Sequence, residues 1–262
     1  MRDVLNIDER RYDWGMVASN TLRHGDPTFP RRICIALSKW CNRRCPYCPV
    51  GVFGASKVMV SDEVFDAFVT RLAEIKWNGW ASIGGYSEPT AVNHLADYVR
   101  KLKAGCPTCL PVVYSNGDYL TPDVVLSLRN AGLHHLIVTR HKPYSLSWDT
   151  RMESCLSVAD SQITVRNLKD SDLVNQGGLT DVPYAPFKRC ALPSNSLEFT
   201  TEGIALMCCA DYKVEQPKGN LMENSIRQIW YDRSYFRQRL KLLAGLPETP
   251  LCKRCMAGKV AA

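Results

Sequence analysis

The chain has 262 residues, of which 45% are apolar, and its net charge of +7 comes from 33 Lys and Arg against 26 Asp and Glu. This length suits one large domain with a small appendage. The basic excess is spread without a block of like charge, which argues against a nucleic-acid partner. No apolar stretch approaches the ~20 residues that a membrane-spanning helix needs, and the charged N-terminus is unlike a signal peptide. We therefore expect a cytoplasmic protein with no membrane partner.

The first two thirds of the sequence alternate between short apolar runs and amphipathic segments. Ser61 followed by Asp62 and Glu63 is typical of a helix start, and Thr121 with Pro122 is another. Alternating strands and helices predict a parallel sheet, either open or closed into a partial barrel. The strands are expected at residues 33–37, 80–83, 111–117 (with its turn), 135–139 and 163–166.

Three cysteines, Cys41, Cys45 and Cys48, lie within a stretch of eight residues that follows the first predicted strand. Three thiolates can hold three irons of a cubane [4Fe–4S] cluster and leave the fourth iron open to an outside ligand. The spacing alone also allows a zinc site or a disulfide. In the cytoplasm, however, cysteines are more often reduced or bound to metal than joined in disulfides.

Near residue 182 the alternation stops and prolines become frequent, so we expect a domain boundary there. It separates residues 1–182, which include an N-terminal lead-in, from a small domain at residues 183–262. Residues 197–200 and 204–207 predict a β-hairpin, followed by two helices. A segment of this size with little apolar content is marginally stable alone, and a metal cluster would stabilise it.

The spacing C-x3-C-x2-C, with Tyr47 before the last cysteine, resembles the signature of the radical S-adenosylmethionine (SAM) superfamily. The resemblance implies a partial (β/α)6 TIM-like barrel whose open-site cluster binds and reductively cleaves SAM. The resulting 5'-deoxyadenosyl radical takes a hydrogen atom from the substrate. In such a barrel the chemistry lies at the C-terminal ends of the strands, where residues 84–88 and 115–117 also fall. Tyr47 would lie against the adenine of SAM, with core packing as the alternative.

The end of the second predicted strand and the turn after the third are the expected SAM contacts. Gly84, Gly85 and Glu88 resemble the family's glycine-rich strand end, whose acidic residue contacts the SAM amino group. Glycine lets the backbone approach a ligand closely, and a carboxylate complements an ammonium. Ser115 and Asn116 are similar to the family's third-strand turn, where polar side chains meet the ribose or carboxylate of SAM. Without the resemblance, each stretch reads as an ordinary turn.

The C-terminal cysteines resemble the twitch or SPASM extension of radical SAM enzymes, which holds an auxiliary iron–sulfur cluster. Full ligation by four thiolates leaves no open iron and suits electron transfer. Adjacent residues on a strand point to opposite faces, so Cys208 and Cys209 are not expected to be ligands together, and the family pattern favours Cys208. A zinc site is the alternative. The expected ligands of one auxiliary [4Fe–4S] cluster are Cys190, Cys208, Cys252 and Cys255.

The resemblance implies a radical SAM oxidoreductase with a one-electron donor such as flavodoxin or ferredoxin. An auxiliary cluster is useful when the substrate radical must lose a second electron, which favours dehydrogenation of a small polyol or amino sugar in specialised metabolism. One alternative is an epimerase in which Cys209 or another thiol donates a hydrogen atom. The others are a peptide-modifying (RiPP) maturase and a non-catalytic, zinc-stabilised binding protein.

Overall fold

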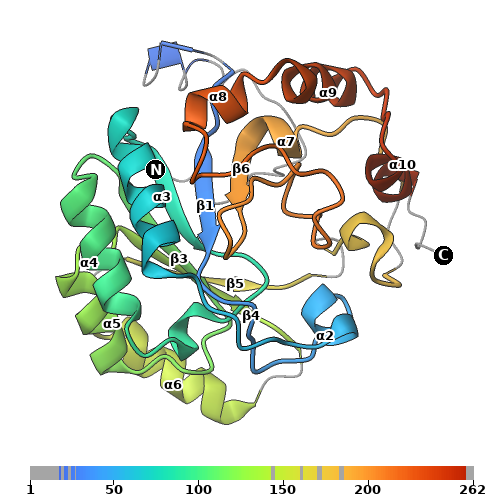
Figure 1. Cartoon of the computed structure of the whole chain (residues 1–262). Helices are drawn as coiled ribbons and strands as arrows, with labels where there is room; N and C mark the ends of the chain where they lie inside the picture. Colours follow the sequence, from blue (N-terminus) through green and yellow to red (C-terminus); the bar gives the residue numbers. More distant parts are fainter. Residues whose placement is uncertain are drawn as a thin grey trace.

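The computed structural model of the chain describes residues 18, 21–22, 25–26, 28–142, 145–159, 162–169, 173–182 and 186–257. Most of the expected lead-in, and residues 183–185 at the expected domain boundary, lie outside this part. The described residues form a parallel sheet with one row of helices along its outer face (Figure 1). A C-terminal group of loops and short helices lies beside the first and last strands (Figure 1).

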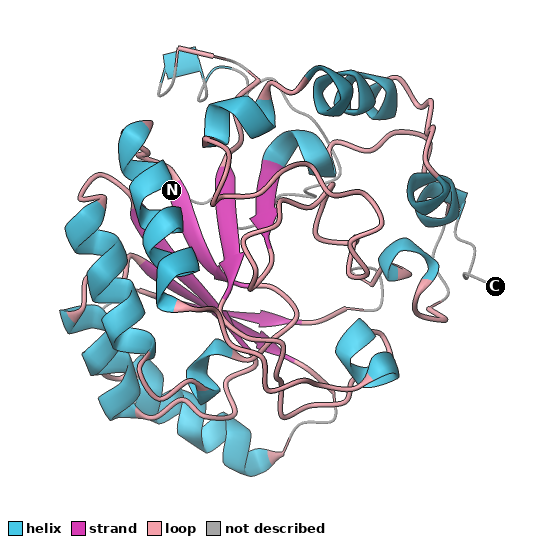
Figure 2. Ribbon diagram, in the orientation of Figure 1, coloured by secondary structure: helices cyan, strands magenta, loops and turns pink. Residues whose placement is uncertain are grey.

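Six parallel strands form the sheet, in the order β5-β4-β3-β2-β1-β6 (Figure 2). Parallel neighbours need crossover connections, which the intervening helices supply. The sheet confirms the predicted partial barrel, and all five strands expected in the first domain are present. The strands are β1 (Arg32–Ala36), β2 (Trp80–Gly84), β3 (Leu110–Ser115), β4 (His135–Arg140), β5 (Ile163–Asn167) and β6 (Ser196–Phe199).

The strand β6 is both the edge of this sheet and the first arm of the expected hairpin. It pairs with β1 in parallel, with Ile35 opposite Phe199. The chain then turns back, so that the Leu206 N–H donates to the Glu198 carbonyl at 2.9 Å and Phe199 bridges Ala205 in antiparallel fashion. The sheet therefore contains a strand from beyond residue 182, and the domain boundary itself stays a prediction.

Four helices cover the outer face of the sheet, and the two predicted N-caps are present. The Ser61 hydroxyl accepts from the Val64 N–H, and the Thr121 hydroxyl accepts from the Val124 N–H. Buried apolar side chains of these helices pack on the strands and form the core. The helices are α3 (Asp62–Glu74), α4 (Leu95–Gly105), α5 (Pro122–Asn130) and α6 (Leu146–Leu156).

Short helices position the loops at the carboxyl end of the sheet and the C-terminal segment. The sequence predicted α8 and α9 but not α10. The first turn of α10 contains Pro250 and Cys252, and its second turn contains Cys255. Within the described residues, no helix is both long and apolar enough to span a bilayer. These elements are α2 (Pro49–Phe53), η1 (Pro89–Ala91), η3 (Gln176–Gly178), α7 (Leu192–Asn195), α8 (Ile226–Trp230), α9 (Arg233–Leu243) and α10 (Pro250–Ala257).

Candidate active site

The first set of cysteines lies in the loop between β1 and α2, at the carboxyl end of the sheet. The Cys48 carbonyl accepts hydrogen bonds from the Gly51 N–H at 2.8 Å and the Val52 N–H at 3.3 Å, both in α2. A Cβ on Gly51 would lie 2.0 Å from the Cys45 carbonyl oxygen, so only glycine lets the loop fold against α2. Burial, and then the neighbouring thiols, raise the pKa of Cys48. The three half-buried thiols are near enough to influence one another electrostatically, and their sharing of one cluster stays a prediction.

Glu88 lies between the ends of β2 and β3 and is 1% exposed. Its Oε1 accepts from the Ser115 hydroxyl at 2.8 Å and from the Thr90 N–H at 3.0 Å, and its Oε2 accepts from the Asn116 N–H at 2.6 Å. Burial raises the pKa of Glu88, while these hydrogen bonds oppose the rise. Glu88 therefore joins the two strand ends. A carboxylate oxygen can accept two bonds, which leaves Oε2 able to meet an outside donor; its contact with SAM stays a prediction.

Asn116 connects this carboxylate to the cysteine loop. Its side-chain amide donates to Asn42 Oδ1 at 2.9 Å and lies 3.8 Å from the Cys41 sulfur. Gly85 has a φ of +88°, which favours glycine, and a Cβ there would lie 3.3 Å from the Cβ of Ala36. The structure thus brings Cys41, Glu88, Ser115 and Asn116 together, while Gly84 packs beside the Tyr114 ring.

Tyr47 lies on the other side of the cysteine loop, against His141 at the end of β4. The rings are nearly parallel with centroids 6.0 Å apart, and the Tyr47 hydroxyl is 3.0 Å from His141 Nδ1. Burial, together with the nearby Arg43 charge, lowers the pKa of His141 to about 4. The imidazole is therefore neutral near pH 7.

The second set of cysteines gathers where three separate segments meet in the C-terminal part. Cys190 precedes α7, and Cys252 and Cys255 lie on α10. Cys208 follows residues 204–206, which turn back along β6. Residues three apart share a helix face, so one face of α10 offers two thiols. Burial raises the pKa of Cys208 well above its ordinary value, and the adjacent Cys209, followed by the other three thiols of the set, adds to the rise. The four thiols are therefore gathered in one region, and their role as ligands of one cluster stays a prediction.

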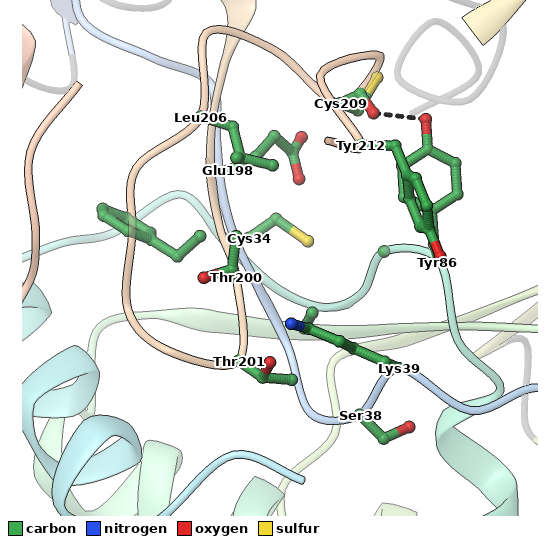
Figure 3. A pocket seen from close by; sticks show the side chains of 13 residues that line it. Cys34, Ser38, Lys39, Tyr86, Glu198, Thr200, Thr201, Leu206, Cys209 and Tyr212 are labelled. Atoms are coloured by element: carbon green, nitrogen blue, oxygen red, sulfur yellow. Dashed lines mark hydrogen bonds between the residues drawn. The ribbon is translucent and has the colours of Figure 1, made fainter. Parts of the chain in front are cut away.

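The adjacent Cys209 has different neighbours. Its carbonyl accepts a 2.5 Å hydrogen bond from the Tyr86 hydroxyl, and Cys209 lines a cavity at the carboxyl ends of β1 and β6 (Figure 3). Cys208 lies near the C-terminal thiols and Cys209 lines the cavity. The two residues stand in a bend and a turn rather than on a strand, so the expected strand geometry does not apply, and Cys208 as a ligand stays a prediction. No disulfide joins any of the twelve cysteines, all of which belong to the described residues.

Arg254 fastens α10 to the loops around the second set of cysteines. Its Nη2 donates to both carboxylate oxygens of Glu215, at 2.7 and 2.9 Å, and its Nε donates to the Gly177 carbonyl at 3.0 Å. Asp211 is fully buried and accepts from the backbone of Glu215 and Gln216. These contacts hold the turn after Cys209 against α10.

The cavity has a volume of about 220 Å³. Burial raises the pKa of its lining residue Tyr86, and the thiols of Cys209, Cys48 and Cys208 add to the rise, so the cavity lies near both sets of cysteines. Figure 3 shows the Cys34 sulfur and the Glu198 carboxylate pointing toward the same space. Aromatic rings close one side, because Tyr86 meets Tyr212 edge-on at 5.0 Å and Tyr212 stacks on Phe53 of α2 at 6.1 Å. The chemistry-bearing residues of its lining are Cys34, Lys39, Tyr86, Glu198, Thr200 and Cys209.

Glu198 is the carboxylate of this cavity. Its Oε1 accepts from Arg32 at 2.9 Å, and Arg32 also donates to the Tyr114 hydroxyl at 3.1 Å. Burial, and then the nearby Glu198 charge, raises the pKa of Cys34 well above its ordinary value. A positively charged residue also lines the cavity: Lys39, which forms an ion pair with the half-exposed Glu202 at 2.6 Å.

Sequence reasoning named Gly85 and Cys209 as candidate site residues but missed the rest of this lining. Cys34 reads as a small buried apolar residue, and the structure places it on the cavity wall. Glu198 carried a usable signal, since a charged residue stands between Leu197 and Phe199 in an apolar strand. Such a residue in a buried strand must be paired, and Arg32 at the start of β1 is the partner.

Comparisons with known proteins agree with this geometry. Residues 190–256 match the model of the SPASM family, an iron–sulfur cluster-binding domain. The S-adenosyl-L-methionine-dependent 2-deoxy-scyllo-inosamine dehydrogenase of Niallia circulans is 27% identical over 226 residues, covering 84% of this chain and 90% of the relative. The crystal structure of BtrN in complex with AdoMet and 2-DOIA superposes with a TM-score of 0.80 at 26% identity, over 89% of this chain and 96% of BtrN. The open conformation of BtrN gives a TM-score of 0.68 at 24% identity, over 87% and 92% of the two chains.

The chain is a radical SAM enzyme with a C-terminal SPASM-type iron–sulfur domain. Its cofactors are [4Fe–4S] clusters and SAM, and it is a SAM-dependent oxidoreductase. Within that class its dehydrogenase relative from Niallia circulans and the BtrN structure are similar over most of the chain.

Proposed function

We propose that this enzyme dehydrogenates a secondary alcohol of a small amino polyol. The dehydrogenase relative is named for 2-deoxy-scyllo-inosamine, and the BtrN crystal structure holds 2-DOIA with AdoMet. The observation that carries the proposal is the cavity near both sets of cysteines, with Glu198 in its wall. Its volume of about 220 Å³ is below the roughly 300–1,000 Å³ typical of pockets for drug-sized ligands. A cyclitol is a better match for that space than the peptide substrate of a maturase.

We further propose a division of labour between the two sets of cysteines. Cys41, Cys45 and Cys48 would hold the SAM-binding cluster; Cys190, Cys208, Cys252 and Cys255 would hold the auxiliary one. When bound, the clusters and SAM supply hydrogen-atom abstraction and a path for the second electron. The expected SAM contacts are Tyr47, Gly84, Gly85, Glu88, Ser115 and Asn116.

The residues of the chain would orient the substrate between these sites. The Glu198 carboxylate offers a charge-assisted partner for a substrate ammonium, and the ion pair with Arg32 holds that carboxylate in place. The aromatic wall of Tyr86 and Tyr212 excludes water on one side. Because Tyr86 also bonds to the Cys209 carbonyl, the cavity wall is tied to the segment that holds Cys208.

The test is an anaerobic assay of reconstituted enzyme with SAM and a low-potential one-electron reductant, for which flavodoxin or ferredoxin is the expected biological source. Amino cyclitols, neutral polyols and short peptides are offered in parallel, and products are identified by mass spectrometry. The proposal predicts a ketone two hydrogens lighter than the amino cyclitol, formed in equal amount with 5'-deoxyadenosine. A product of unchanged mass, or turnover of peptides alone, would contradict it.

A second candidate function, epimerisation, has one observation in its favour: Cys209, which is not among the expected cluster ligands, lines the cavity. A thiol there could return a hydrogen atom to the opposite face of a substrate radical. In deuterated water an epimerase would place deuterium on the product carbon, and Cys209→Ala would abolish that product. A dehydrogenase would give an undeuterated ketone at that carbon, with Cys209→Ala still active.

A further inference from the structure

Asp118, in the turn after β3, makes a bidentate ion pair with an arginine inside the cysteine loop. Arg43 Nε donates to Asp118 Oδ2 at 2.7 Å, and Arg43 Nη2 donates to Asp118 Oδ1 at 2.6 Å. Asn42 adds a third bond from its side-chain amide to Oδ2 at 2.6 Å. Two consecutive residues between Cys41 and Cys45 are therefore fixed to one carboxylate.

The carboxylate is itself held in place from the opposite side. The Asp118 N–H donates to Asn116 Oδ1 at 2.9 Å, and Asn116 in turn donates to Asn42 and, through its backbone, to Glu88. The turn has little freedom, because Gly117 has a φ of +80° and a Cβ there would lie 2.9 Å from Val138. Asp118 thus transmits the position of the β3 end to the cysteine loop.

Burial makes this pair stronger than a surface ion pair. The Arg43 and Asp118 side chains are 15% and 20% exposed. Asp118 raises the pKa of Arg43, and hydrogen bonds from Arg43 and Asn42 hold the pKa of Asp118 below its usual range despite its burial. Bidentate, partly desolvated pairs fix geometry as well as adding energy.

The same arginine reaches the other side of the loop. Arg43 Nη1 donates to the His141 carbonyl at 3.0 Å, and the Arg43 N–H donates to the Cys41 sulfur at 3.4 Å. One guanidinium therefore connects the ends of β3 and β4 across the loop of three thiols. Fe–S clusters respond to hydrogen bonds at their sulfurs, so the orientation of this segment bears on the cluster as well as on its ligand.

We propose that Asp118 is a positioning residue for SAM binding. Through Arg43 and Asn42 it holds the loop 41–48 in one orientation relative to Glu88 and Asn116, so that a ligand on the open iron meets those groups without further ordering. The inference rests on the proposed assignment of Cys41, Cys45 and Cys48 to the SAM-binding cluster. A loop that is correctly oriented only part of the time weakens the apparent affinity in proportion to that fraction.

The test is a SAM titration of the reduced, reconstituted protein, followed by the change in the electron paramagnetic resonance signal of the first cluster. The variants are Asp118→Asn, Arg43→Gln and their combination. Glu74→Gln, which breaks the Arg71–Glu74 ion pair on α3 on the outer face of the sheet, is the matched control. Affinities are expressed per assembled cluster, and Arg43→Lys, which keeps the charge but loses the fork, replaces any variant that assembles too little iron.

The positioning role predicts that Asp118→Asn binds SAM about tenfold more weakly, the effect of losing one charge-assisted hydrogen bond. The double variant should bind about as weakly as either single variant, because one pair acts as a unit. The reduction potential of the first cluster should shift in Asp118→Asn and in Arg43→Gln, and it should stay unchanged in Glu74→Gln. Wild-type affinity and potential in Asp118→Asn, or strictly additive losses, would overturn the inference. A wild-type protein whose signal ignores SAM would instead overturn the proposed function, and this inference with it.

Discussion

Replacing Glu198 by glutamine tests the cavity most sharply, because the change removes one charge and almost no volume. A hydrogen bond to a charged group contributes about 1.5–3 kcal/mol, so loss of the carboxylate should lower kcat/KM for an amino cyclitol by about 10- to 100-fold. The same cyclitol with a hydroxyl in place of the amine never forms the ion pair. For that substrate, the loss should be within about threefold.

The variant should also be less stable, because Arg32 keeps its charge in a site where its side chain is 14% exposed. Glutamine still offers an amide oxygen, so we expect a loss of about 1–3 kcal/mol in the free energy of unfolding. Glu202→Gln is the matched control; its pair with Lys39 is about half exposed and should contribute less than about 1 kcal/mol.

The two assays are steady-state kinetics with the amine and hydroxyl substrates, and urea unfolding of both variants. Only a loss that depends on the substrate amine supports Glu198 as its counter-ion. If Glu198→Gln lowers kcat/KM equally for the two substrates, the carboxylate acts through the architecture of the cavity, and the reasoning fails.

Three further predictions concern the two cysteine sets and the sheet. Gly51→Ala forces a Cβ to within 2.0 Å of the Cys45 carbonyl; the first cluster should assemble poorly, seen as lost SAM response with the second cluster's signal intact. Replacing Cys208 and Cys252 together by alanine leaves only two thiolates of the second set and should remove about half of the bound iron, since each cubane holds four irons; normal iron content would exclude the pair as ligands. Burial holds the pKa of His135 below its ordinary value of 6.5. As the pH falls, His135 is therefore protonated in the unfolded chain before it is protonated in the folded one, and the free energy of unfolding decreases below about pH 6.5. His135→Gln should flatten that part of the melting temperature profile, and an unchanged slope would count against it.

The sequence predicted the barrel well because its signals are local. The caps at Ser61 and Thr121 were recognisable from adjacent residues, and the apolar runs marked five strands. The helix α6 was harder to recognise, since its buried side chains are only Trp148, Met152 and Cys155. The edge strand β6 looked like an isolated hairpin arm, because its parallel pairing with β1 spans more than half of the chain and leaves no local trace.

The candidate site likewise has parts that the local sequence could predict and parts that depend on the folded chain. Cysteine spacing predicted the first thiol set, and the resemblance to the SPASM extension predicted the second, because a cluster restricts the type of residue that can bind it. The cavity near them depends on side chains brought together by the fold, such as Cys34 with Glu198. Likewise, a glutamate after a glycine-rich strand end is visible in the sequence, but the burial of Glu88 under donors from Thr90, Ser115 and Asn116 is a tertiary property.

The most direct test of the central claim follows one hydrogen atom. The reconstituted enzyme is given SAM, reductant and an amino cyclitol deuterated at the carbinol carbon, and 5'-deoxyadenosine is analysed by mass spectrometry. The account predicts one deuterium in 5'-deoxyadenosine for each ketone formed, with deuterium absent from that carbon of the product. Ketone formation with unlabelled 5'-deoxyadenosine, or label retained at the carbinol carbon, would contradict it.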